Sequence, residues 1–188
     1  VVPTIAVEVA HQLASTGLQL DSNGLSTAYR VTLRILFRLL FQAYAEDRGL
    51  LPSGRNEGFD ANSLKTNAGR LLVSDGVEFG EASTIWRDLE QVWNAIDQGN
   101  PHWQIPAYNG GLFSTDAERS PDGALIDEIK LPDKILGPAL RHLLIDRNSD
   151  GDEGPVDFRS LSVREFGTIY EGLLESSLSL AEQDLTAD

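Results

Sequence analysis

The chain has 188 residues, of which 15 are Lys or Arg and 29 are Asp or Glu, giving a formal net charge of −14. That balance argues against autonomous, non-specific binding to DNA, because phosphate neutralisation needs a cationic surface. The absence of cysteine excludes disulfides, cysteine zinc sites and thiol nucleophiles, and three histidines leave little room for a histidine metal site. Hydrophobic residues make up 41% of the chain, which suffices for an ordinary globular core.

The sequence contains no apolar run of the ~20 residues that a membrane-spanning helix needs, and no basic region followed by an apolar core of the kind that marks a signal peptide. We therefore expect a cytoplasmic protein without a membrane partner. Methionine is absent, even at position 1. We interpret the chain as a piece of a longer protein.

Hydrophobic periodicity is the main structural signal. In the clearest segment, Ser26 or Thr27 can cap a helix of about 22 residues that Gly49 and Pro52 end. Its predicted core-facing stripe is Leu33, Leu36, Phe37, Leu40, Phe41 and Tyr44. The clearer predicted helices cover residues 27–48, 81–98, 132–145 and 162–175, and two short segments, 4–16 and 63–73, have weaker helical patterns.

These elements, with no strand pattern longer than a few residues, predict an all-α fold. We expect four or five helices in a bundle-like arrangement with long loops, forming one domain over residues 1–188. Ser162 and Glu165 have the spacing of a capping box at the start of the last helix. Tyr170 and Glu171 on that helix are interpreted as structural, with Tyr170 in the core.

An acidic stretch between the last two helices has the D-x-N-x-D-G spacing of a calcium loop. Its tenth position is Pro155, and its twelfth is an aspartate where an EF-hand has a bidentate glutamate. The alternative is an acidic hairpin between two helices, which needs no metal. The candidate Ca²⁺ ligands are Asp146, Asn148, Asp150, Asp152 and Asp157.

Two further motifs come close to known catalytic patterns. Asp122 after a proline, followed by Glu128 and Lys130, is similar to the PD…ExK motif of Mg²⁺-dependent nucleases, but only five residues separate the two carboxylates. Residues 100–103 (Asn-Pro-His-Trp) are one residue away from the Asn-Pro-Pro-aromatic motif of amino-methyltransferases. We interpret the first as a charged loop and the second as the end of a helix.

Arg30, Arg34 and Arg38 stand on one face of the predicted long helix, at i, i+4 and i+8. This row could contact DNA phosphates, or pair with the abundant acids of the fold. A second unusual stretch, 108–113, is interpreted as a structural loop plugged into the core. Its motif residues are Tyr108, Asn109, Gly110, Gly111 and Phe113.

Three stretches, 39–52 (which contains YAEDRGLLP), 105–113 (which contains YNGGLF) and 157–175 (which contains LSVREFGTIYEGLLE), together resemble a region of known proteins. That region is the helical part preceding the methyltransferase domain of type IIG-like restriction–modification enzymes and of phage-defence adenine-specific DNA methyltransferases. The stretches cover about a fifth of the chain, in this order.

The resemblance implies a parent enzyme that methylates adenine N6 in DNA with S-adenosylmethionine and that could carry a Mg²⁺-dependent nuclease domain. Its methyltransferase domain is expected after residue 188, so no catalytic or cofactor-binding residue can be assigned within this chain. The implied role is a connector that contacts neighbouring domains of the same polypeptide, and DNA through the full-length protein. Two alternatives stay open: a protein-interaction module of a phage-defence complex anchored by loop 108–113, and a calcium-binding helical module.

Overall fold

The computed structural model describes residues 2–73, 78–108, 110–147, 151–162, 164–165, 167–168 and 171. The chain is mostly helical, as predicted. The longer helices are α1 (Val2–Ser15), α2 (Ser22–Asp47), α4 (Leu64–Val73), α5 (Thr84–Gln98) and α7 (Asp133–Leu144). Their bounds lie within a few residues of the predicted ones, except at the start of α2. The shorter elements are α3 (Glu57–Asp60), α6 (Pro121–Ala124), η1 (Leu125–Glu128), β1 (Ile145–Arg147), β2 (Glu153–Pro155) and η2 (Phe158–Ser160).

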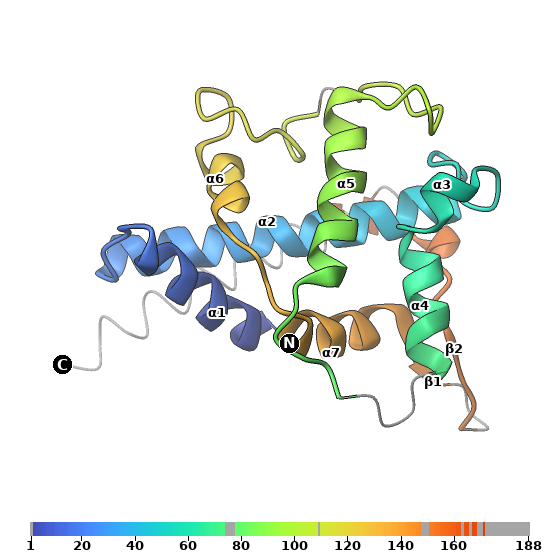
Figure 1. Cartoon of the computed structure of the whole chain (residues 1–188), viewed down its shortest axis with the longest axis horizontal. Helices are drawn as coiled ribbons and strands as arrows, with labels where there is room; N and C mark the ends of the chain where they lie inside the picture. Colours follow the sequence, from blue (N-terminus) through green and yellow to red (C-terminus); the bar gives the residue numbers. More distant parts are fainter. Residues whose placement is uncertain are drawn as a thin grey trace.

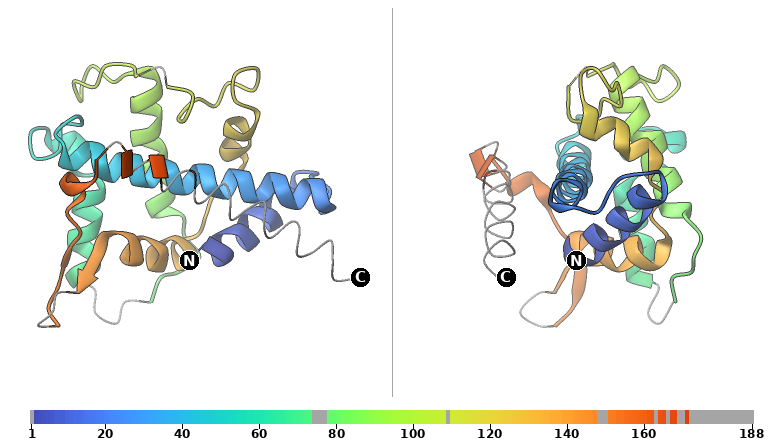
Figure 2. Two further views of the ribbon diagram at one scale, coloured as in Figure 1. Left: turned by 180° about the vertical axis from the view of Figure 1, so that it is seen from behind. Right: turned by 90° about the vertical axis from the view of Figure 1, so that its left-hand side faces the viewer.

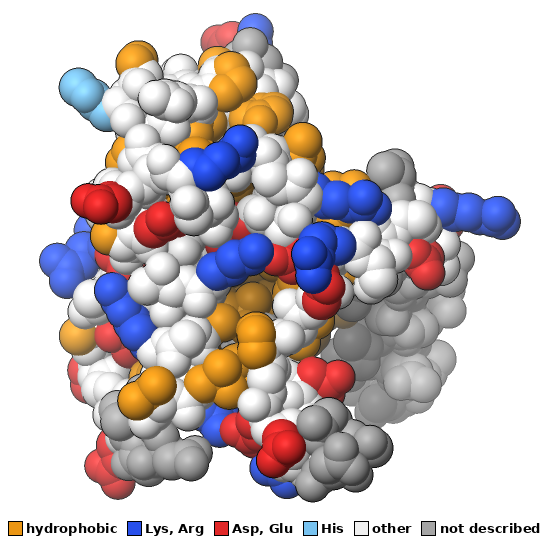
Figure 3. Space-filling model, turned by 90° about the vertical axis from the view of Figure 1, so that its right-hand side faces the viewer, with side chains coloured by type: hydrophobic (Ala, Val, Ile, Leu, Met, Phe, Trp, Pro, Cys, Tyr) orange, Lys and Arg blue, Asp and Glu red, His pale blue; other side chains and the backbone are white. Residues whose placement is uncertain are grey.

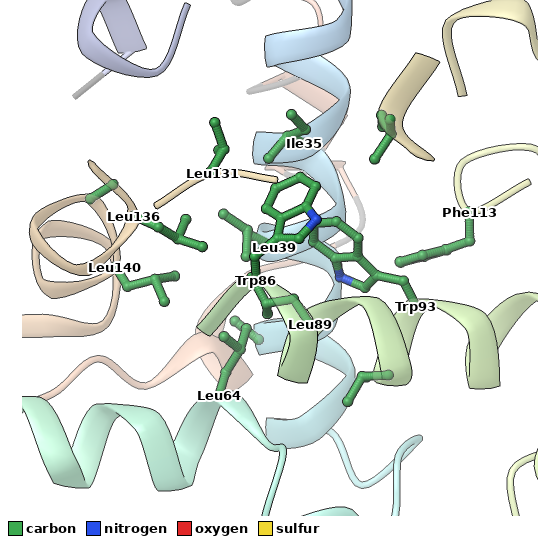
Figure 4. Packing of buried hydrophobic residues seen from close by; sticks show 14 of the residues in the cluster. Ile35, Leu39, Leu64, Trp86, Leu89, Trp93, Phe113, Leu131, Leu136 and Leu140 are labelled. Carbon is green, nitrogen blue, oxygen red and sulfur yellow. The ribbon is translucent and has the colours of Figure 1, made fainter. Parts of the chain in front are cut away.

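Helix α2 runs through the whole molecule, and the other elements pack around it (Figure 1). Helix α5 crosses it, α1 and α7 lie along one side, and α4 lies near its C-terminal end. One hydrophobic cluster includes residues from α1 through η2, so these elements share a single core. At its centre the rings of Trp86 and Trp93 meet edge to face at 5.4 Å, next to Leu39 of α2 (Figure 4).

Helix α2 begins at Ser22, five residues before the predicted start. The cap is Asp21, whose carboxylate accepts a hydrogen bond from the backbone N–H of Gly24 at 2.9 Å. The composition of Asp21–Gly24 fits a polar break equally well, because the same residue types favour turns and helix caps. Gly24 is needed because a Cβ there would lie 1.7 Å from the carbonyl oxygen of Gln19.

The predicted core-facing stripe of α2 is buried or partly buried, but it is not the side of the helix that supplies the members of the main cluster. The main cluster takes its α2 residues from the opposite side: Ala28, Val31, Ile35, Leu39, Ala43 and Ala45. Leu36, Leu40, Phe41 and Tyr44 are only partly buried at its margin. Leu33 and Phe37 are buried but do not belong to the cluster. Both sides of α2 are apolar, and periodicity alone cannot choose between them.

The acidic stretch after α7 forms the hairpin that we named as the alternative to a calcium loop. Strands β1 and β2 pair antiparallel, with Asp146 opposite Gly154 and Arg147 opposite Glu153. The predicted capping box is confirmed: Glu165 accepts from the Ser162 N–H at 2.7 Å, and the Ser162 hydroxyl accepts from the Glu165 N–H at 3.2 Å.

Candidate functional site

Two arginines of the row on α2, Arg34 and Arg38, bind the loop that ends at residue 114. Arg38, only 2% exposed, donates from Nε to the Leu112 carbonyl oxygen at 2.9 Å. Its Nη2 donates to the carbonyl oxygens of Phe113 at 3.1 Å and Ser114 at 3.3 Å. A guanidinium carries five N–H donors in a fixed plane, which suits a turn with several converging carbonyl groups. Arg38 therefore fixes the path of this loop.

The charge of Arg38 is also stabilised by aromatic rings. Its Cζ lies 5.2 Å from the centre of the Trp93 ring and 5.7 Å from that of Phe113. Burial lowers the pKa of Arg38 to about 10, and the neighbouring positive charge of Arg34 contributes to that lowering. The side chain remains charged at neutral pH.

The other two arginines of the row are also bound within the fold. Arg34 donates from Nε to the Leu112 carbonyl oxygen at 3.1 Å and from Nη2 to that of Gly111. Arg30 holds the carboxylate of Asp122 in a two-point contact, at 3.0 and 3.2 Å. Arg38 is too deeply buried to contact DNA phosphate, which corrects that part of the prediction. The alternative prediction, that the row pairs with acids elsewhere in the fold, is confirmed for Arg30.

A series of buried hydrogen bonds runs from Trp93, which also contacts Arg38, towards the C-terminal end of α2. The Trp93 Nε1 donates to Gln42 at 3.1 Å, and Gln42 Nε2 donates to the Glu46 carboxylate at 2.9 Å. The two carboxylate oxygens of Glu46 accept from the backbone N–H groups of Leu64 at 2.9 Å and Lys65 at 3.0 Å. Glu46 thus satisfies two of the free N–H groups at the start of α4. Burial raises the pKa of Glu46, although these hydrogen bonds oppose the rise.

Asp47, the last residue of α2, and Arg48, which follows it, hold the segment around η2. Asp47 Oδ2 accepts from the Phe158 N–H at 2.7 Å, while Asp47 Oδ1 lies 2.7 Å from Lys65 Nζ. Arg48 Nη2 donates to the Leu161 carbonyl oxygen at 3.2 Å. The YAEDRGLLP stretch is therefore bonded to the residues that lead into the LSVREFGTIYEGLLE stretch.

The YNGGLF stretch reaches the same end of α2 through its first residue. The Tyr108 hydroxyl donates to the Leu50 carbonyl oxygen at 2.9 Å. At the other end of this stretch, Phe113 is 4% exposed and its ring meets that of Phe41 at 5.4 Å. The prediction that this loop is plugged into the core holds for Phe113. Tyr108 is 40% exposed, and Asn109 lies outside the described residues.

A half-open pocket of about 400 Å³ lies between the C-terminal part of α2, α4 and the segment after β2. Its walls are mainly apolar, and charged side chains stand among them. On the face that carries α4 and the hairpin, hydrophobic side chains occupy a hollow with basic and acidic side chains around it (Figure 3). The charged lining residues are Glu46, Asp47, Lys65, Asp157 and Arg159.

Part of the proposed calcium loop lies outside the described residues, namely 148–150, which include Asn148 and Asp150. Asp146 lies in β1 and Asp152 in the hairpin, both exposed. Asp157 is two residues beyond β2, and its carboxylate is bound to the Arg159 guanidinium at 2.6 Å, which lowers its pKa to about 2. Within the described ranges, no three His, Asp or Glu side chains gather as metal ligands. Calcium binding by this stretch stays a prediction.

The PD…ExK resemblance does not lead to a nuclease-like arrangement. Asp122 lies in α6, where Arg30 holds its carboxylate, and Glu128 ends η1. The backbone of Lys130 is bound to the side chain of Gln12 at 2.7 and 3.1 Å. The two carboxylates come from short helical turns rather than from strands that present both to one ion.

Residues 100–103 form a turn after α5, as interpreted from the sequence. The Asn100 side chain accepts from the Trp103 N–H at 3.1 Å, and the Trp103 ring meets Phe59 edge to face at 5.8 Å. Asn56 donates to the His102 carbonyl oxygen at 3.0 Å. These contacts tie the turn to α3.

Sequence reasoning missed the individual roles of Glu46 and Asp47, although it singled out the stretch that contains them. The available signal was a carboxylate pair at the end of an apolar helix, where burial requires partners. The partners lie 18 and 111 residues away in sequence, so no local pattern could name them. Tyr170 lies outside the described residues, and Glu171 is exposed.

The chain matches no family model, no curated protein and no solved structure. In the described part of the chain, no helix has both the length and the apolar character that crossing a bilayer requires.

Proposed function

We propose that this chain is a non-catalytic helical connector of a DNA restriction–modification enzyme. Its parent would transfer a methyl group from S-adenosylmethionine to adenine N6 in DNA through a domain located after residue 188, and could carry a nuclease domain that uses Mg²⁺. The proposal begins from the resemblance of the three sequence stretches to the helical region before such methyltransferase domains.

One structural observation supports this proposal best: hydrogen bonds join the first stretch, at the C-terminal end of α2, to the beginning of each of the other two. Arg38 holds the YNGGLF loop, Tyr108 returns from that loop to Leu50, and Asp47 and Arg48 hold the segment leading to Ser162. Among the described polar groups of these stretches, Asp47, Arg48 and Tyr108 form hydrogen bonds to distant parts of the fold. A connector has this requirement, because it must keep a fixed geometry between the domains on either side of it.

The charge of the chain fits a connector better than an autonomous DNA-binding module. The net charge is −14, and the arginine row, the most suitable cationic feature in the sequence, is used internally. In the proposed arrangement, any contact with DNA is made by the assembled full-length protein.

The test is methyl transfer from labelled S-adenosylmethionine to unmethylated DNA, with the full-length natural protein and with this 188-residue chain side by side. We expect activity in the full-length protein alone. Activity in the isolated chain would contradict the proposal, and inactivity of both would remove its support.

A variant in the full-length protein tests the connecting role itself. Asp47→Asn removes the carboxylate that bonds Phe158 and Lys65, so we expect methyl transfer to fall several-fold while S-adenosylmethionine binding is kept. Val73→Ser, at a side chain 87% exposed, is the matched control and should leave the rate unchanged. An unchanged rate in Asp47→Asn would show that the contacts of Asp47 with Phe158 and Lys65 do not couple this chain to the methyltransferase domain.

The alternative of a protein-interaction module is favoured by one observation, the exposure of Tyr108 and Leu50. They are 40% and 50% exposed and lie together, joined by the hydrogen bond from the tyrosine hydroxyl. Phe113 of the same loop is buried in the core, so Tyr108 is the aromatic residue of this loop that a partner could reach. In this function, Tyr108→Ser should weaken capture of a defence-complex partner without lowering the melting temperature, whereas the connector proposal predicts no stable partner for the isolated chain.

A further inference from the structure

Helix α2 has an outer face that contributes no member to the buried hydrophobic cluster. We define this outer face as Leu33, Phe37, Leu40 and Tyr44, which succeed one another at intervals of four, three and four residues. At 100° per residue they fall on the opposite side of the helix from Ile35 and the other core residues. A helix that is apolar on both sides needs cover on both sides.

The outer face is most deeply buried in its N-terminal half. Leu33 and Phe37 are 2% and 3% exposed, yet neither belongs to the hydrophobic cluster that the other elements share. Leu40 and Tyr44, further along the same face, are partly buried at the cluster's margin. Something other than the main core must therefore account for the burial of Leu33 and Phe37.

The chain leaves η2 close to one end of this face. Asp47 and Arg48, at the C-terminal end of α2, bond Phe158 and Leu161, and the capping box at Ser162 and Glu165 then starts a helical turn. Figure 2 shows η2 on the side of α2 opposite to α5. A helix that starts at Ser162 thus begins next to the outer face.

The residues of this segment divide into two sides. The described Arg164, Glu165, Thr168 and Glu171 are all exposed, and at 100° per residue they fall within one side of a helix. The apolar residues fall on the other side: Val163, Phe166, Ile169, Tyr170 and Leu173. The segment 162–175 is therefore amphipathic by sequence, with its polar side turned to solvent wherever the structure describes it.

We propose that the apolar side of segment 162–175 docks along the outer face of α2, antiparallel to it. The lengths agree: Leu33 to Tyr44 spans ~17 Å and residues 162–175 span ~20 Å, at 1.5 Å per residue. The direction follows from the bond between Arg48 and Leu161, which sets the start of the segment at the C-terminal end of α2. This docking does not depend on the proposed connector function.

Engineered cysteine pairs test the docking and its register, and the chain has no cysteine of its own to interfere. Taking residue 162 as level with residue 48, antiparallel packing brings Phe37 level with Leu173 and Tyr44 level with Phe166. We expect the Phe37→Cys/Leu173→Cys and Tyr44→Cys/Phe166→Cys variants to form intramolecular disulfides on mild oxidation. The control pair Phe37→Cys/Phe166→Cys is offset by seven residues, ~10 Å along the axes, which exceeds the Cα separation of a disulfide.

Cross-linking that is equally fast in the control pair would overturn the register and with it the docking. Disulfides that form only between molecules, and that disappear on dilution, would assign the outer face to a second copy of the chain instead. The reduced variants are to be compared with the natural chain by circular dichroism, so that only folded variants are interpreted.

Single-cysteine labelling tests the docking independently of disulfide geometry. In the full chain, the thiol of a Phe37→Cys variant should react at least ten-fold more slowly than that of Val73→Cys, which replaces a side chain 87% exposed. Adding Ile169→Asp, which places a charge on the apolar side of the segment, should remove most of that protection. Equal labelling rates at the two sites, or protection unaffected by Ile169→Asp, would refute the proposal.

Discussion

Arg38 holds the loop of residues 112–114 by hydrogen bonds to three carbonyl oxygens, an arrangement that we call the loop clamp. Replacing Arg38 by methionine is the sharpest test of this clamp, because methionine keeps much of the apolar side-chain volume and removes all donors. Three carbonyl oxygens accept from Arg38, and that of Leu112 keeps a second donor in Arg34. Those of Phe113 and Ser114 lose their Arg38 donor. A buried carbonyl left without a partner costs ~1–3 kcal/mol, so two of them amount to ~2–6 kcal/mol.

Two effects limit that cost. The variant no longer carries the desolvation penalty of a buried cation, whose size the lowered pKa of about 10 reflects. The loop can also swing open and let water reach its carbonyl groups, at the expense of the buried Phe113 side chain, which contributes ~1.5–3 kcal/mol. We therefore expect Arg38→Met to lower the free energy of unfolding by about 2–4 kcal/mol.

Arg34→Met is the matched control on the same helix face and the same loop. Arg38 still serves Leu112, and Gly111 is exposed, so water can replace the lost donor. The cost should stay below ~1 kcal/mol. Urea unfolding followed by circular dichroism and tryptophan fluorescence measures both variants, and Trp93 reports directly on the altered site. Equal costs for the two variants, or a cost of Arg38→Met below ~1 kcal/mol, would refute the clamp.

Further predictions concern a buried acid and two helical glycines. Because burial raises the pKa of Glu46, the folded state binds more protons than the unfolded state above pH 4.5, and the stability from this group is lost as pH rises through the raised pKa. The stability advantage of the natural chain over Glu46→Gln, measured by urea unfolding, should be larger at pH 5 than at pH 7. An equal advantage at both pH values would contradict a raised pKa for Glu46. Gly137→Ala should destabilise by ~1–3 kcal/mol, since its Cβ would lie 2.5 Å from the Phe79 ring. Gly69→Ala, with no atom within 4 Å of its Cβ, should instead stabilise by up to ~1 kcal/mol; melting temperatures that shift in the same direction would exclude this packing.

The local elements followed closely from the sequence where one face alone is apolar. Helix α5 ends at Gln98, the predicted last residue, and α7 begins one residue after the predicted first position. The capping box at Ser162 also formed as its spacing predicts, because its two hydrogen bonds lie within one turn. Such features depend on interactions between residues three or four apart, which a single sequence displays directly.

The tertiary structure decided what periodicity left open. Helix α2 is apolar on both sides, so only its packing against α5 and α7 determined that Ile35 and Leu39 enter the core. The use of the arginine row was equally undetermined, because the carbonyl groups that bind Arg38 lie 74 to 76 residues away. The residue types alone required that a buried cation and buried carboxylates find partners. Which partners they found depended on how α2 brought the loop at 108–114, the start of α4 and the segment around η2 to its surface.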